Sequence, residues 1–358
     1  MTILHVISGL GTGGAEAMLL QVTGALQAKG MPQHVVSVTE RGRYADELEG
    51  RGVPVIALGV NSVFSGLRGL LRLARLIGQL QPQVVQGWMY HGDLMALFAH
   101  YLARERVRRR LYWNLRASNM DQGGYGWLMR INAFLSRWPD LVIANSRAGA
   151  DYHIGMGYRP RRLEVIANGI DTDRFRPDPQ ARKAVRSELK IPAETVVAIH
   201  VARVNEMKDH ATFLAAMRSV PDVQAIMVGD GTEKLKAPPN VRALGLRSDT
   251  ARLYAAADIV VSTSAFGEGF SNAIGEGMSA GLVPIATDCG DARLIIGDTG
   301  AVISVGDASA LADRIAAESA ATPERRHARS LAARARIEQE FPLSRAIEAF
   351  ARLYGATV

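Results

Sequence analysis

Short apolar runs alternate with helical patterns along most of the chain, and this alternation is what most restricts its fold. Runs such as 3–7, 84–88 and 195–201 are rich in Val and Ile, and each leads through a glycine-containing or polar turn into an amphipathic stretch. Continuous apolar strands separated by helices are typical of a parallel sheet covered on both faces. The rhythm stops at 171–192, a polar segment with three prolines, and then begins again. We therefore predict two doubly wound α/β units.

The predicted domain boundaries follow this pattern. The first unit covers 1–170, the polar segment 171–192 is the linker, and the second unit covers 193–342. The final helical stretch, 343–358, is expected to pack back on the first unit. Two units in 358 residues agree with the usual size of protein domains.

The composition excludes several classes of protein. The single cysteine, Cys289, cannot build a disulfide framework or a cysteine zinc site. No apolar run approaches the ~18–20 residues of a membrane span, and the N-terminus lacks the pattern of a signal peptide, so we expect a cytoplasmic protein. The net charge of +7 is compatible with an anionic substrate or membrane. We expect no nucleic-acid partner, because zinc-finger spacing and RNP-type aromatic motifs are absent from the sequence.

The most informative stretch is 268–276, which begins and ends with a glutamate. The apolar run 259–264 precedes it and indicates a buried strand, and a helix rich in small residues follows it. Glu268 is therefore expected on the loop after a strand, and Glu276 about one turn into the helix.

Between these glutamates the sequence favours contact with an anion. Gly269 lets a ligand approach the backbone closely, and Ser271 or Asn272 is a suitable N-cap for the helix. The N–H groups at a helix start bind phosphate well. With Glu268 near a sugar and Glu276 near a ribose, the stretch would bind a nucleotide sugar. The alternative is a surface loop with two solvated glutamates.

A glycine-rich turn near the N-terminus permits two interpretations. Gly9, Gly11 and Gly14 satisfy the G-x-G-x-x-G fingerprint, and Glu40 ends the next strand, as in NAD-dependent oxidoreductases. The run 13–16, Gly-Gly-Ala-Glu, suits equally a loop whose backbone donors contact a diphosphate or a sugar.

Polar residues follow two other predicted strands. His91 follows the run 84–88, and Arg203 follows the run 195–201, with Lys208 five positions further on. Open α/β sheets bind ligands at the carboxyl ends of their strands. His91 is therefore the histidine best placed for binding or proton transfer, with a structural role as the alternative.

The predicted helix 67–80 places Arg68, Arg72 and Arg75 on one side and leucines on the other. It is either an ordinary scaffold helix or a contact with an anionic membrane surface. A nearby arginine cluster supports membrane contact, although a solvated loop also explains it. This cluster consists of Arg104, Arg106, Arg108, Arg109 and Arg110.

Five features, in this order, resemble the retaining glycosyltransferases of family 4. They are Gly-Gly-Ala-Glu at 13–16, Asn-Gly-Ile-Asp at 168–171, Arg203 with Lys208, Gly-Asp-Gly at 229–231, and the glutamate pair. The resemblance covers nearly the whole chain and implies the GT-B fold, with the donor nucleotide sugar bound mostly by the second unit. It implies no cofactor and no metal ion. The literal D-x-D at 171–173 is the metal motif of another glycosyltransferase fold, and we expect no metal there.

The resemblance also implies roles for individual residues. Arg203 and Lys208 would stabilise the departing diphosphate, Glu268 would contact the donor sugar and Glu276 the ribose. His91 would lie near the transferred sugar. The remaining donor-binding residues would be Gly14, Gly229, Leu246, Gly269, Phe270, Ser271 and Asn272.

The predicted function is metal-independent, retaining transfer of a sugar from a nucleotide diphosphate sugar to an acceptor hydroxyl. A UDP-linked donor is favoured and a GDP-linked donor comes second. The acceptor would be a glycan or a lipid-linked glycan in cell-surface glycan synthesis, with the inner face of the membrane as a contact surface. Alternatives are a GT-B-fold sugar-nucleotide epimerase, an NAD-dependent oxidoreductase and a non-catalytic subunit.

Overall fold

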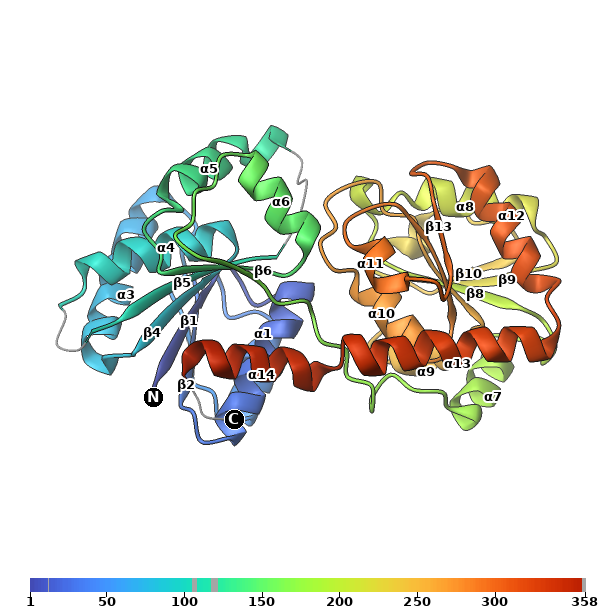
Figure 1. Ribbon diagram of the computed structural model, residues 1–358, viewed down its shortest axis with the longest axis horizontal. Coiled ribbons are helices and arrows are strands. Elements are labelled where there is room, and N and C mark those ends of the chain that lie inside the picture. The colour runs from blue at the N-terminus through green and yellow to red at the C-terminus, as the bar shows by residue number, and fades with distance from the viewer. Residues whose placement is uncertain (12, 105–107, 117–121, 356–358) are drawn as a thin grey trace. The chain divides into compact units, whose positions relative to one another are not determined.

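The computed structural model describes residues 1–11, 13–104, 108–116 and 122–355 (Figure 1). The chain divides into two compact units. The first contains Met1–Asn168 and the C-terminal segment that begins at Ser344, and the second contains Gly169–Leu343.

The first unit is built on a parallel sheet with the strand order β3-β2-β1-β4-β5-β6-β7. The strands are β1 Ile3–Ile7, β2 Gln33–Ser37, β3 Val55–Ala57, β4 Val84–Trp88, β5 Arg110–Leu115, β6 Leu141–Ala144 and β7 Leu163–Val165. Their side chains are largely buried on both faces, which explains the continuous apolar runs. The strand order reverses between β1 and β4, where an open α/β sheet usually binds its ligand.

Seven helices cover this sheet in the described residues. They are α1 Gly14–Ala28, α2 Tyr44–Gly50, α3 Val63–Leu80, α4 Met89–Leu102, α5 Gln122–Leu135, α6 Arg147–Gly155 and α14 Leu343–Tyr354. The C-terminal helix α14 packs on the first unit through buried aromatic rings. Phe350 stacks on Trp88, with ring centroids 6.0 Å apart, and the Tyr354 hydroxyl donates to Gln86 Oε1 at 2.6 Å.

The second unit contains a parallel sheet with the order β10-β9-β8-β11-β12-β13. The strands are β8 Val197–Val201, β9 Gln224–Val228, β10 Val241–Ala243, β11 Ile259–Ser262, β12 Val283–Thr287 and β13 Ala301–Ile303. The helices are α7 Pro179–Glu188, α8 His210–Ser219, α9 Thr250–Ala255, α10 Asn272–Ser279, α11 Ala292–Ile296, α12 Ala308–Ser319 and α13 Pro323–Glu340, with short 3₁₀ turns η1 Glu206–Lys208 and η2 Thr232–Lys234. Each unit is therefore a doubly wound α/β layer structure.

The segment 171–192, expected to be a linker, belongs to the compact second unit. Its central part forms α7, which begins with the Asp178 side chain accepting a hydrogen bond from Ala181 N at 2.9 Å. Arg186 is buried and its guanidinium pairs with the carboxylate of Asp258 at 2.9 Å. The prolines at its ends therefore bound a helix docked on the unit.

None of the helices in the described part of the chain combines the length and the hydropathy that a membrane span needs.

Candidate active site

The second unit gathers its polar site residues on loops at the carboxyl ends of β8, β9 and β11. Arg203 follows β8 and is exposed, and it forms no hydrogen bond or ion pair with the described residues. Lys208 ends η1, where its backbone N–H donates to Asn205 Oδ1 at 3.1 Å. Asp209 then adopts φ 39° and caps α8 by accepting from Thr212 N at 3.1 Å. This sharp turn fixes where the Lys208 side chain starts.

The Lys208 ammonium forms an ion pair with Glu268 Oε1. The same oxygen accepts a hydrogen bond from the Ser264 hydroxyl at 2.8 Å. The two charged side chains are only 23% and 12% exposed, so water screens their attraction weakly. Thr263 Oγ1 donates to the Lys208 carbonyl at 2.9 Å and so ties the lysine turn to the end of β11. Residues that are 60 positions apart in sequence therefore form one rigid charged cluster.

Gly229 holds the loop that carries Arg203. It adopts φ 145°, and a Cβ built on it would lie 2.0 Å from the carbonyl oxygen of Ala202. Val204 N donates to the Asp230 carbonyl at 2.8 Å, so the turns after β8 and β9 are joined on both sides of Arg203. The observed role of Gly229 is thus to allow close backbone packing.

Helix α10 presents an uncapped N-terminus next to Glu268. Ser271 is its N-cap residue, but its buried side chain makes no capping hydrogen bond. The N–H groups of Ala273 and Ile274 donate to no group in the described residues. These orphan donors and the helix dipole favour an anion. The Phe270 ring is buried against Phe341, with centroids 5.2 Å apart, so only the backbone of Phe270 is available to a ligand.

Glu276 lies one turn into α10 and is half-buried. Burial raises the pKa of Glu276 from 4.5 to about 7, against the lowering effects of the Arg174 charge and of a hydrogen bond with Tyr254. Tyr254 is fully buried and packs edge-on against Phe175, at 5.9 Å between centroids. A carboxylate that costs free energy to ionise at neutral pH is typical of a binding or catalytic position.

Leu246, Gly269 and Asn272 complete the predicted set in the second unit. Leu246 follows β10 and is 58% exposed, so its side chain is available to a flat ligand such as a base. The Gly269 carbonyl accepts a hydrogen bond from Asp291 N at 3.0 Å. A Cβ added to Gly290 would lie 2.5 Å from the same carbonyl oxygen. Asn272 is the first residue of α10.

Gly14 and His91 belong to the first unit, at the carboxyl ends of the neighbouring strands β1 and β4. Gly14 is exposed at the first position of α1. His91 is exposed in the first turn of α4, and Met89 before it adopts φ 64°. Positive φ at a residue other than glycine is uncommon and often marks a functional site.

Arg116 is a further site candidate that is absent from the set predicted from the sequence. It follows β5, its Nη2 donates to Asn168 Oδ1 at 2.6 Å, and its guanidinium lies 5.3 Å from the Trp88 ring centroid. Burial lowers the pKa of Arg116 to about 9, and the Glu16 charge raises it. Its Nε and Nη1 have no partner in the described residues. A polar residue directly after a buried strand was the available signal.

The dinucleotide interpretation of the glycine-rich turn does not fit the structure. In the fingerprint the third glycine allows close helix–strand packing, whereas Gly14 is exposed at the start of α1. The loop after β1 instead packs on the loop after β2, because Thr39 Oγ1 donates to the Ser8 carbonyl at 2.9 Å and a Cβ on Gly42 would lie 2.3 Å from the Leu10 carbonyl oxygen.

The Asp171 carboxylate of the D-x-D sequence accepts a hydrogen bond from Arg174 N at 2.9 Å. The described residues contain no group of three or more His, Cys, Asp or Glu side chains arranged to hold a metal ion.

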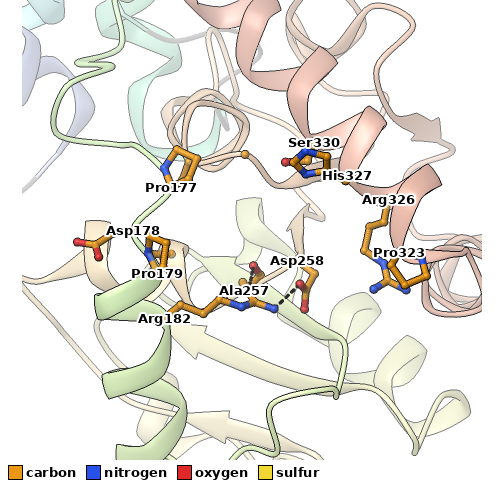
Figure 2. A pocket seen from close by; sticks show the side chains of 13 residues that line it. Pro177, Asp178, Pro179, Arg182, Ala257, Asp258, Pro323, Arg326, His327 and Ser330 are labelled. Carbon is orange, nitrogen blue, oxygen red and sulfur yellow. Dashed lines mark hydrogen bonds and ion pairs between the residues drawn. The ribbon is translucent and has the colours of Figure 1, made fainter.

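A pocket of about 310 Å³ lies in the second unit, at the amino ends of the sheet strands, beside the residues that precede β11 and β12 (Figure 2). Its charged groups already have structural partners. Arg182 donates to the Ala257 carbonyl at 2.9 Å and pairs with Asp258 at 2.7 Å, and Arg326 donates to the Ala321 carbonyl at 2.9 Å. This pocket is therefore part of the scaffold.

Comparison with known proteins relates both units to glycosyltransferases. Residues 195–318 match the family described as glycosyl transferases group 1, and residues 12–174 match glycosyltransferase family 4. The chain is 31% identical over 209 residues to D-inositol 3-phosphate glycosyltransferase of Mycobacterium sp. (strain JLS), which covers 52% of this chain and about half, 47%, of that protein. It is 26% identical to lipopolysaccharide core biosynthesis glycosyltransferase LpsD of Rhizobium meliloti (strain 1021), over 88% of this chain and 91% of LpsD.

The fold has close counterparts among solved structures. The crystal structure of Anabaena Alr3699/HepE in complex with UDP and glucose superimposes with a TM-score of 0.86 at 24% sequence identity, covering 99% of both chains. WaaG, a glycosyltransferase involved in lipopolysaccharide biosynthesis, gives a TM-score of 0.72 at 16% identity. The two parallel α/β units are those of the GT-B fold.

Proposed function

Because the chain belongs to the family 4 glycosyltransferases, we propose that it transfers a sugar from a nucleotide diphosphate sugar to an acceptor hydroxyl, with retention of configuration and without a metal ion. The observation that carries this proposal is the cluster of Lys208 and Glu268 beside the uncapped start of α10. Arg203, exposed and unpaired within the described residues, adds a second cation on the same side of the sheet.

This arrangement suits the departure of a diphosphate. As the bond from the sugar C1 to the diphosphate oxygen breaks, negative charge grows on the diphosphate, and fixed cations and helix N–H groups stabilise it without reorganising. The acceptor oxygen forms its bond to C1 on the same face, and its proton passes to the leaving diphosphate oxygen. Glu268 holds the Lys208 ammonium in place beforehand and has a second oxygen for the sugar hydroxyls.

A UDP-linked donor is the first choice and a GDP-linked donor the second. The structural likeness to HepE, solved in complex with UDP and glucose, supports the first choice. Glu276 would accept hydrogen bonds from the ribose, and Leu246 would contact the base. The likeness to lipopolysaccharide core glycosyltransferases supports a glycan or lipid-linked glycan as the acceptor in cell-surface glycan synthesis.

A thermal-shift panel of UDP, GDP and ADP sugars tests the donor, because a ligand bound only by the folded state raises the melting temperature. Transfer assays with the donor that binds then test the site. Replacing Lys208 with Ala should lower kcat about 10²–10³-fold, the usual effect of removing one preorganised charge-stabilising donor. Lys183→Ala, an exposed lysine on α7, is the matched control. Parental kcat in Lys208→Ala would contradict the assigned role.

The finer parts of the proposal have their own readouts. The anomeric configuration of the product, determined by NMR, distinguishes retention from inversion, and full activity in a chelator supports the absence of a metal requirement. Incubating the donor alone distinguishes transfer from epimerisation, because an epimerase converts the donor without an acceptor.

A further inference from the structure

The outer side of α3 carries an ordered apolar stripe. Val63 is 91% exposed, Phe64 84%, Leu67 61% and Leu71 40%. At about 100° of rotation per residue, these four positions lie within about 100° of one another. The opposite side of the helix, which includes Leu73, is buried in the core. Side chains of this size normally gain stability by burial, so a continuous exposed stripe indicates a binding surface.

The N-terminal cap of α3 keeps the first of these residues on the surface. Ser62 Oγ accepts from Ser65 N at 3.3 Å, and Ser65 Oγ accepts from Ser62 N at 2.9 Å, which completes a capping box. Val63 and Phe64 therefore occupy the first helical turn and cannot fold back onto the core as loop residues would.

Arginines adjoin the stripe on the exposed side of the helix. Arg68 and Arg75 form no hydrogen bond or ion pair with the described residues, and Arg72 donates to the Ala57 carbonyl at 3.2 Å. Helix α3 contains no Asp or Glu. An apolar stripe with a cationic flank is the pattern of helices that lie in the interface of an anionic membrane.

The apolar surface continues on the two neighbouring helices. Tyr101 and Leu102 of α4 are 62% and 53% exposed, and Trp127 and Phe134 of α5 are 64% and 59% exposed. The buried sides of α3, α4 and α5 share one core cluster, so the three helices cover the same face of the sheet (Figure 1). We call their exposed side the α3–α5 face.

We propose that the α3–α5 face binds the surface of a lipid bilayer that contains anionic lipids. Its three helices contain one carboxylate, Asp93, which is fully buried, so the face is cationic. A second copy of the same face would bring arginines against arginines, whereas anionic headgroups would neutralise them. Trp127 and Tyr101 are residue types that favour the membrane interface.

The arginine cluster after α4 contributes only in part. Arg109 is buried and donates to backbone carbonyls at the end of α4, and Arg110 donates to a carbonyl of α14. Arg106 lies outside the described residues. Arg104 and Arg108 are exposed and are available to headgroups.

Sedimentation of the full chain with vesicles tests the proposal, using phosphatidylcholine alone and phosphatidylcholine mixed with phosphatidylglycerol. We expect binding to the mixed vesicles that weakens as salt rises. Arg68→Gln with Arg75→Gln should weaken it about 25-fold, since each arginine near an anionic surface contributes about fivefold. Phe64→Gln with Leu67→Gln should weaken it at least tenfold at unchanged charge.

Matched controls come from exposed residues of the second unit. Leu331→Gln on α13, where Leu331 is 55% exposed, and Arg314→Gln on α12 should leave vesicle binding unchanged. The fluorescence of the parent should also shift to the blue on mixed vesicles, and Trp127→Phe should remove this shift.

Vesicle binding is measured without donor or acceptor, so its result is independent of the transfer reaction. Parental binding by both α3 variants would overturn the proposal. So would a concentration-dependent dimer, seen by sedimentation velocity without lipid, that the Phe64→Gln and Leu67→Gln changes abolish.

Discussion

Replacing Glu276 with Gln should make the second unit more stable and the nucleotide site weaker. The pKa of Glu276 is raised from 4.5 to about 7 by burial, so the folded state binds its proton more tightly than the unfolded state does. A raised pKa contributes stability that is fully present below pH 4.5 and is lost as the pH rises through 7. The ionised carboxylate therefore destabilises the ligand-free protein at neutral and alkaline pH.

The size of this effect follows from the two pKa values. At about 1.4 kcal/mol per pH unit, ionised Glu276 lowers the free energy of unfolding by about 3 kcal/mol at pH 8, and by about 1 kcal/mol at pH 5. These figures are upper limits, because the carboxylate keeps some contact with solvent. Glu276→Gln should recover most of this energy. It should also weaken nucleotide binding about 10–100-fold, because a ribose hydroxyl bonds a carboxylate more strongly than an amide.

Hydrogen exchange is the suitable assay, because it reports on each unit separately. Amides of β8 and β12 should exchange more slowly in Glu276→Gln than in the parent at pH 8, and the difference should shrink at pH 5. Comparing variants at one pH cancels the intrinsic exchange rate. Glu194→Gln, an exposed glutamate, is the control. Equal protection of Glu276→Gln and the parent at pH 8, or a gain that persists at pH 5, would refute the reasoning.

Two further predictions concern residues that support the two sheets. Burial lowers the pKa of His5 from 6.5 to about 4, and its Nδ1 accepts from Trp88 Nε1 at 3.0 Å, so only the neutral ring fits. As the pH falls, the unfolded state binds the proton first, so the free energy of unfolding should fall by about 3 kcal/mol between pH 6.5 and 4. His5→Asn should reduce this dependence of the unfolding free energy on pH. Urea titrations followed by tryptophan fluorescence, which reports the first unit, measure it. Gly229→Ala should lower the free energy of unfolding by about 2 kcal/mol or more and reduce the donor-induced thermal shift, because the added Cβ would lie 2.0 Å from the Ala202 carbonyl oxygen. The control is Gly306→Ala, where φ is 77° and no atom lies within 4 Å of the added Cβ. It should destabilise the protein less and leave the donor-induced shift unchanged.

The sequence predicted the strands well because buried parallel strands are apolar on both faces. The run 3–7 coincides with β1 and 84–88 with β4, and the run 195–201 contains β8. The short edge strand β13 carries only three residues and gave no comparable signal. The segment 171–192 looked like a linker because it is polar, yet its arginines find buried carboxylate and carbonyl partners that are distant in sequence.

The candidate site can be located from the sequence alone, because its polar residues follow buried strands. The contacts between these residues cannot be predicted in the same way, because they join segments that are distant in sequence. Lys208 and Glu268 were both predicted, but their ion pair depends on the alignment of β8 and β11 in one sheet. The sequence predicts that Phe270 and Ser271 line the ligand, but both side chains are buried, so only their backbone groups are available for that contact. The raised pKa of Glu276 depends on how the chain packs around α10, so no sequence pattern predicts it.

Helix α3 shows the same limit at the surface. The leucine and arginine periodicity predicted a helix from 67, but the capping box of Ser62 and Ser65 starts it at Val63. Those additional residues make Val63 and Phe64 the most exposed large apolar side chains of the described chain. Had the helix begun at Leu67, both would have been free to turn inward. Because the cap prevents this, the exposed stripe is a fixed property of the fold, and its apolar surface remains in water until a partner such as the lipid surface covers it.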